Sequence, residues 1–130
     1  MNPAERKRDS AQPELTVISK IADAIAFAEG FYVPESRPCR NNNPGDLERD
    51  LTGKATARDG PYVIYATAED GWAALRHQVR LMFEGSHIYK PSMTIGEVAQ
   101  HFTSTQSDSW ARNVAARLEV TVTTQLDQIL

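Results

Sequence analysis

Apolar residues recur every three or four positions in two long stretches of the chain, the spacing of one face of a helix. The first stretch runs from Leu15 to Glu29 and ends before Gly30, a common helix stop signal. The second follows Thr67, a residue type that caps helix N-termini, and runs to Gly85. The two apolar stripes consist of Ile18, Ile21, Ala22 and Ile25, and of Trp72, Leu75, Val79 and Met82. Both stretches are predicted to be amphipathic helices that pack into a core.

Two shorter helices are predicted toward the C-terminus. Thr94 and Glu97 have the spacing of a capping box, and the helix that they open ends near Phe102. The next helix takes its cap from Ser107 or Asp108. Its apolar residues are Trp110, Val114 and Leu118. After these two helices, Leu126, Ile129 and Leu130 indicate a short terminal helix.

The middle of the chain is predicted to contain a loop and a small hairpin. Between Phe31 and Asn43, Pro34 and Pro38 interrupt any periodic pattern and favour a loop. The segments Gly45 to Asp50 and Tyr62 to Tyr65 are then predicted to pair as two short strands. The expected fold class is therefore mainly α, in an α+β arrangement.

Length and charge narrow the classes of function. A chain of 130 residues supports one compact domain, expected over residues 15–130. The formal net charge is −3, so neither a nucleic acid nor an anionic membrane is the expected partner. Cys39 is the single cysteine, which rules out a disulfide within the chain.

Residues 1–14 are expected to form a flexible N-terminal arm, because they are charged, contain two prolines and offer little apolar surface. They lack the apolar core of a secretory signal, and no membrane span is predicted in the chain. We therefore expect a protein that stays in the cytoplasm until it is released or exported by another route.

Glu29 is the main candidate for catalysis. At 100 degrees per residue it lies about 20 degrees from Ile18 around the helix, within the apolar stripe that contains Ile25. An apolar wall and the negative end of the helix dipole would both raise the pKa of its carboxyl group, as a general acid requires. The alternatives are a solvated residue beside a glycine cap, or an ion pair with Arg37 or Arg40 that lowers the pKa.

Three motifs follow in a specific order: Ala28-Glu29-Gly30, then Asn42-Asn43-Pro44-Gly45-Asp46-Leu47, then Tyr65-Ala66-Thr67 with Glu69-Asp70-Gly71-Trp72-Ala73-Ala74-Leu75. Together they resemble the lysozyme-like superfamily, which includes phage muramidases and lytic transglycosylases. The resemblance covers roughly residues 18–118. It implies helices and a small hairpin flanking a cleft, peptidoglycan as partner, and Glu29 as the acid that protonates the glycosidic oxygen.

The resemblance also indicates further site residues. Asp46 is the candidate second carboxylate, although an Asp there can simply stabilise a turn. Tyr65 and Thr67 are candidates for binding a sugar or for fixing Glu29, and Thr67 is equally a helix cap. Asn43 is a further substrate-binding candidate, and Trp110 would stack on a sugar ring or belong to the core.

The type of reaction is left open by the sequence. Lytic transglycosylases need no second carboxylate, so both hydrolysis and transglycosylation fit a single acid. A catalytically inactive saccharide-binding or structural module, such as a phage or secretion-system component, is the alternative.

No cofactor is expected, and no metal site either, because His77, His87 and His101 lack ligand spacing. The oligomeric state and sugar specificity are not predicted.

Overall fold

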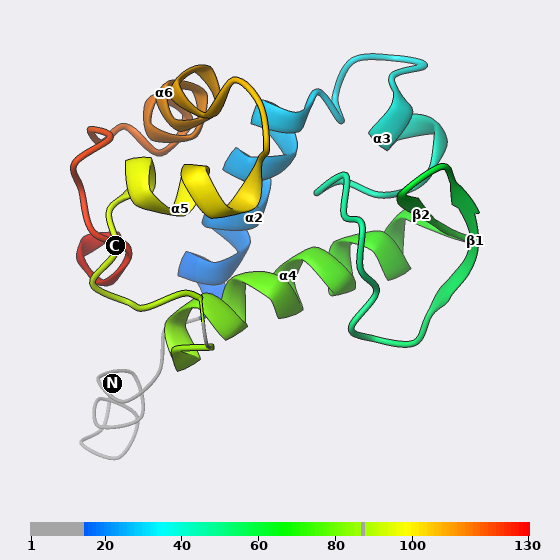
Figure 1. Cartoon of the computed structure of the whole chain (residues 1–130), viewed down its shortest axis with the longest axis horizontal. Coiled ribbons are helices and arrows are strands. Elements are labelled where there is room, and N and C mark those ends of the chain that lie inside the picture. The colour runs from blue at the N-terminus through cyan, green and yellow to red at the C-terminus, as the bar shows by residue number, and fades with distance from the viewer. Residues whose placement is uncertain (1–14, 87) are drawn as a thin grey trace.

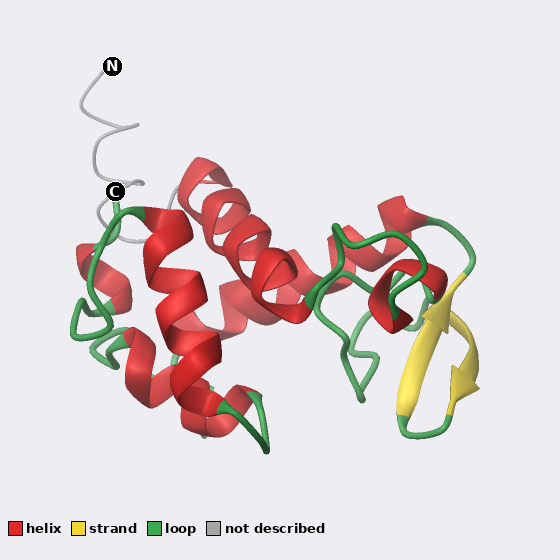
Figure 2. Cartoon of the chain, turned by 90° about the horizontal axis from the view of Figure 1, so that it is seen from above, coloured by secondary structure: helices red, strands yellow, loops and turns green. Residues whose placement is uncertain are grey.

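The computed structural model describes residues 15–86 and 88–130, and the predicted N-terminal arm lies outside these ranges (Figure 1). The elements follow in the order α2 (Leu15–Glu29), α3 (Arg37–Arg40), β1 (Ala55–Asp59), β2 (Tyr62–Tyr65), α4 (Ala68–Glu84), α5 (Ile95–Phe102), α6 (Ser107–Leu118) and the 3-10 turn η1 (Leu126–Gln128). Figure 2 shows α2, α5 and α6 grouped at one end of the molecule and the two-stranded sheet at the other, with α4 joining them. The predicted mainly helical α+β class is confirmed.

The core lies where α2, α4, α5 and α6 meet. Helix α2 packs against α4 and α6, and α5 packs against α6. The predicted stripes are largely buried, with Ile18, Ile25, Leu75 and Val79 all in the core, while Trp72 is partly exposed. None of the described helices is both long enough and apolar enough to cross a membrane.

Local capping signals explain where three helices begin and end. The Thr67 side chain accepts a hydrogen bond from the Asp70 amide at 3.1 Å, and the predicted capping box of Thr94 and Glu97 forms in both directions. Gly30 follows α2 with φ +83°, in the left-handed region that a glycine adopts without a steric penalty. The predicted bounds of these helices are confirmed to within a residue.

The predicted cap of the fourth helix is wrong. Helix α6 begins at Ser107 itself, and its N-cap is Gln106, which has φ +54° and makes no side-chain cap hydrogen bond. Ser107 already has helical geometry, so its hydroxyl group is not at the position from which a cap reaches the next turn.

The first strand of the hairpin is formed by a different segment from the one predicted. Strand β2 pairs antiparallel with Ala55–Asp59, not with residues 45–50, and Asp59 opposes Tyr62 across a two-residue connection at Gly60 and Pro61. Residues 45–50 are joined to β2 by a backbone hydrogen bond from Val63 to Leu47, of 3.0 Å. A short connection brings two strands together with little loss of chain entropy, which favours the partner nearest in sequence.

The predicted loop between Phe31 and Asn43 contains a short helix. Ser36 caps α3 by accepting a hydrogen bond from the Cys39 amide, and Pro38 lies in the first turn. Proline is tolerated there because first-turn amides have no partner within the helix. The interpretation of Pro38 as a helix breaker was therefore wrong.

Replacing Glu119 with glycine should stabilise the fold. Glu119 is the C-cap that follows α6, with φ +60°, and the next amide, that of Val120, donates to the Ala115 carbonyl at 2.9 Å. A side chain at such a position is strained, so Glu119→Gly should raise the free energy of unfolding by about 0.5–1 kcal/mol in urea denaturation. Glu84→Gly, within helix α4, is the control and should lower it. Equal destabilisation by both variants would contradict the assignment of strain.

Candidate active site

Glu29 lies at the last turn of α2, half-buried, with one carboxyl oxygen held by Trp110. The indole Nε1–H donates to Glu29 Oε2 at 2.8 Å. Burial raises the pKa of Glu29 to about 7, and the charge of Asp46 adds to this rise. The hydrogen bond from Trp110 and the charge of Arg37 act in the opposite direction but do not cancel it. A large fraction of Glu29 is therefore protonated near neutral pH, as predicted from its place in the apolar stripe.

Trp110 has a different role from the sugar-stacking one considered from the sequence. Its side chain is buried, with 6% of the residue exposed, and it stacks on Phe102 with ring centroids 5.1 Å apart. A ring packed in this way has little face left for a sugar. Trp110 is instead a positioning residue, because its only polar atom orients the Glu29 carboxyl group.

A cavity of about 280 Å³ opens beside Glu29. One wall comes from α2, α3, the residues before β1 and the start of β2, through Ala28, Glu29, Arg37, Asp46, Glu48 and Tyr62. The opposite wall comes from the end of α5, the following loop and α6, through Phe102, Thr103, Ser104, Thr105, Gln106, Ser109, Trp110 and Asn113. Its lining is almost entirely polar, which suits a ligand rich in hydroxyl and amide groups.

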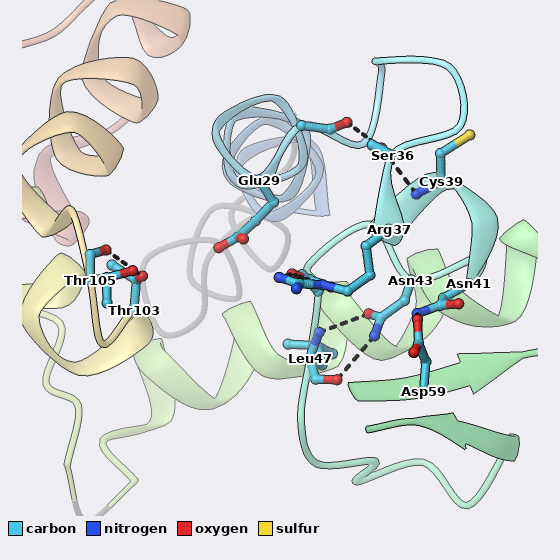
Figure 3. Close-up of polar contacts among 12 residues, drawn as sticks. Glu29, Ser36, Arg37, Cys39, Asn41, Asn43, Leu47, Asp59, Thr103 and Thr105 are labelled. Carbon is cyan, nitrogen blue, oxygen red and sulfur yellow. Dashed lines mark hydrogen bonds and ion pairs between the residues drawn. The ribbon is translucent and has the colours of Figure 1, made fainter. Parts of the chain in front are cut away.

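Arg37 and Asp46 form an ion pair in the wall of this cavity. Arg37 Nη2 lies 2.5 Å from Asp46 Oδ2, and Arg37 Nε lies 3.1 Å from the same oxygen. The guanidinium group also lies over the Tyr62 ring, 3.7 Å from its centroid. Figure 3 shows the Arg37 side chain extending from α3 toward Glu29, yet its ion-pair partner is Asp46. Arg40 donates instead to the Glu35 carbonyl. Neither arginine therefore forms the ion pair that would have given Glu29 a structural role.

The Asp46 carboxylate accepts hydrogen bonds from Arg37, so its side chain does not stabilise the turn through backbone amides. Its backbone does form the predicted turn. Asp46 has φ +48°, and its amide donates to the Asn43 carbonyl at 2.9 Å. Asp and Asn tolerate this left-handed geometry better than other side chains do. Asp46 therefore shapes the turn and also lines the cavity.

Asn43 is a structural residue and not part of the cavity. It is 0% exposed, and its side chain donates to the Leu47 carbonyl at 3.0 Å and accepts from the Leu47 amide at 2.9 Å (Figure 3). It also donates to the Val63 carbonyl at 2.9 Å. These bonds replace the ladder that was predicted between residues 45–50 and β2. The proposed substrate-binding role of Asn43 is corrected, because a side chain with every polar atom bonded inside the fold cannot reach a ligand.

Tyr65 and Thr67 also lie away from the residues that line the cavity. Tyr65 is buried, and its hydroxyl group donates to Asp50 Oδ1 at 3.0 Å. Burial would raise the pKa of Asp50, but hydrogen bonds from Ala55, Thr52 and Tyr65 outweigh it and lower the pKa to about 2. Thr67 is the cap of α4, the alternative that the sequence left open. Neither residue therefore belongs to the cavity beside Glu29, and the Tyr65 hydroxyl group is bonded to Asp50 and does not fix Glu29.

Several lining residues were not found from the sequence. The loop at residues 103–106 and the polar positions Ser109 and Asn113 form one wall, and Tyr62 and Glu48 belong to the other. The only available signal was the polar run between two predicted helices, which is typical of any surface loop. The loop at residues 103–106, Ser109 and Asn113 become neighbours of Glu29 because α6 packs against α2.

The described residues contain no group of three His, Cys, Asp or Glu side chains that could hold a metal ion. Comparisons of the chain with known protein families, with curated proteins and with solved structures find no match. The chemistry of the site is therefore argued from its own residues.

Removing Arg37 should raise the pKa of Glu29 further. In Arg37→Met, Asp46 loses its partner cation and the positive charge near Glu29 disappears, so the neutral form of Glu29 is favoured. Carbon-detected NMR titration of the Glu29 carboxyl should show a higher midpoint than in the wild type. Arg40→Met, on the same short helix, is the control and should leave the midpoint unchanged. A lower midpoint in Arg37→Met would contradict this account of the cavity charges.

Proposed function

We propose that this chain is a lysozyme-like domain that cleaves the glycan strands of peptidoglycan, with Glu29 as the general acid. The observation that carries the proposal is a carboxyl group whose pKa is raised to about 7 beside a polar cavity. A protonated carboxyl group can donate its proton to a glycosidic oxygen as the bond to the sugar C1 breaks. The order of the elements, with a helix ending in Glu29 and followed by a turn, a hairpin and a long helix, supports the lysozyme-like assignment.

Trp110 prepares Glu29 for this step. Its N–H holds Oε2, which leaves Oε1 as the oxygen that carries the proton toward the substrate. Because the indole nitrogen can only donate, it cannot take up the proton of Glu29. The proton on the other oxygen therefore stays available to the leaving group.

The ion pair of Asp46 favours a mechanism with a single acid. A carboxylate that accepts three hydrogen bonds from Arg37 is a weaker base and nucleophile than a free one. The substrate's own acetamido group would then stabilise the positive charge that develops on the sugar ring, or a water molecule would attack the sugar C1. Glu48 is exposed and lines the same cavity, so its carboxylate is the other group that could activate a water molecule.

Purified peptidoglycan is the substrate for the test. The wild type should release soluble fragments, and Glu29→Gln should lower the rate by about 10²–10⁴-fold, the usual contribution of a general acid. Glu84→Gln, at the exposed end of α4 and outside the cavity, is the matched control and should retain full activity. The rate should decline as the pH rises above about 7, because Glu29 then loses its proton. Equal activity of Glu29→Gln and the wild type would refute the assignment.

Mass spectrometry of the fragments separates the two reaction types. Hydrolysis adds a water molecule and leaves a reducing end, whereas intramolecular transglycosylation leaves an anhydro end and adds none. Glu48→Gln extends the test, because it should lower the rate only if Glu48 activates a water molecule. With Asp46 held by Arg37, we expect the anhydro product.

A second candidate is a lysozyme-like module that binds a saccharide without cleaving it. The observation that favours it is the ion pair of Asp46 with Arg37, because it engages the carboxylate that a hydrolase with two carboxylates would use. Binding of peptidoglycan by the wild type, without release of fragments at any pH between 4 and 8, would favour this candidate over the enzyme.

A further inference from the structure

A second cavity lies directly beside the one that contains Glu29. It has a volume of about 390 Å³, and Asp46, Glu48 and Phe102 line both cavities. The two cavities are therefore parts of one groove, whose second part lies between residues 45–51 and the helices α4 and α5. Helix α4 contributes Gln78 and Leu81 to the second part.

The linings of the two cavities differ in chemistry. The first is almost entirely polar, whereas the second includes the side chains of Leu47, Leu51, Leu81, Ile88 and Tyr89. Leu51 and Ile88 are 45% and 42% exposed. Exposed aliphatic side chains that gather at a groove favour an occupant with apolar groups of its own. A bare sugar ring, with hydroxyl groups around its edge, does not match this surface.

Charges of both signs accompany the apolar residues. Arg49 and Glu48 are exposed and line the second cavity, and His101 lies edge-on to Tyr89 with ring centroids 5.9 Å apart. Within residues 15–86 and 88–130, Arg49 has no ion-pair partner. A ligand that carries carboxylate and amino groups on a short apolar chain would find a partner for each part.

We propose that the second cavity binds the peptide branch of the substrate while the sugar at the scissile bond occupies the first. This inference rests on the proposed function, and it adds that the groove recognises the peptide branches of peptidoglycan as well as its sugars. A short peptide with small apolar side chains and both charges suits the second cavity. Because Asp46, Glu48 and Phe102 line both cavities, one branched molecule can occupy both parts of the groove.

The geometry also explains why one groove contains such different surfaces. An unbranched neutral polymer would leave Leu51 and Ile88 in contact with water, and binding would gain nothing from them. A peptide placed over them removes apolar surface from water, which favours binding. Discrimination between branched and unbranched glycans therefore arises in the second cavity, away from Glu29.

Binding to Glu29→Gln tests the inference independently of catalysis. Amide and methyl NMR shifts are followed while a muramyl peptide or a peptide-free N-acetylglucosamine tetramer is added. The muramyl peptide should shift Leu81 and Tyr89 in the second cavity as well as residues of the first, whereas the tetramer should shift only the first. Arg49→Gln and Leu51→Ser should each weaken binding of the muramyl peptide several-fold and leave binding of the tetramer unchanged.

Matched controls distinguish the cavity from general surface effects. Arg80→Gln and Leu15→Ser change an exposed arginine and an exposed leucine that do not line either cavity, and they should bind both ligands normally. Muramyl peptide shifts confined to the first cavity, or unchanged binding in Arg49→Gln and Leu51→Ser, would overturn the inference. Release of fragments from peptide-free glycan at the full rate would likewise overturn it while leaving the proposed cleavage intact. Peptide-dependent shifts without any cleavage would support the inference and refute the enzyme.

Discussion

Glu29→Gln should make the protein more stable at pH 8 while it greatly lowers the rate of cleavage. The wild type buries a carboxyl group whose pKa is raised from 4.5 to about 7, so above that pH the folded state contains a poorly solvated charge. Glutamine has nearly the same shape, remains neutral and keeps an oxygen that can accept the Trp110 N–H. We expect a gain of about 1–2 kcal/mol in the free energy of unfolding at pH 8, less than the full pKa difference implies because solvent reaches part of the carboxyl group.

The sign of this effect follows from proton linkage. Between pH 4.5 and about 7 the folded state binds more protons at Glu29 than the unfolded state does. The stability of the wild type relative to the variant is therefore greatest below pH 4.5 and falls as the pH rises through about 7. Above that range the difference in stability between the wild type and the variant no longer changes with pH.

Urea denaturation at pH 4 and at pH 8 measures the difference. The two proteins should have similar stability at pH 4, and the variant should be the more stable at pH 8. Glu84→Gln is the control, and its stability relative to the wild type should be the same at both pH values. A Glu29→Gln protein that is less stable than the wild type at pH 8 would show that the ionised carboxylate is a favourable partner in the fold and would contradict the general-acid assignment.

Gly71→Ala should destabilise the fold severely. Gly71 lies in the first turns of α4, where a Cβ atom would be 1.8 Å from the Asn42 carbonyl oxygen and 2.8 Å from Pro44 Cδ. Both neighbours belong to the tightly bonded turn that precedes Asp46, so neither can move without breaking the hydrogen bonds of Asn43. We expect a loss of about 3 kcal/mol in the free energy of unfolding, at the upper end for overpacking.

Gly96→Ala is the matched control for this prediction. Gly96 is also a helical glycine, but a Cβ atom there would be 3.5 Å from the nearest atom, the Val122 carbonyl oxygen, an ordinary contact. Because alanine is the better helix former, this variant should be as stable as the wild type or more stable by up to about 1 kcal/mol. Thermal and urea unfolding compare the two variants. Similar stability of Gly71→Ala and Gly96→Ala would contradict the close approach of α4 to residues 42–44.

The helices could be predicted because their signals are local. The stripe that contains Ile18 and Ile25, the cap Thr67 and the capping box of Thr94 each depend on residues within one or two turns of one another. The hairpin could not be assigned in the same way. Residues 45–50 contain no β-branched or aromatic side chain, the residue types that favour strands. The buried Asn43 side chain bonds this segment to β2, and the ladder forms with Ala55–Asp59.

The sequence by itself determined that the chain is mainly helical and that Glu29 ends a helix on its apolar side, because both follow from the 3.6-residue period. Only the tertiary structure decided what surrounds that carboxyl group. Trp110, which holds it, is 81 positions away along the chain, and Arg37 was free to pair with either Glu29 or Asp46. Such choices depend on distances between elements that are far apart in the chain, and periodicity carries no information about those distances. The raised pKa and the groove therefore arise from packing.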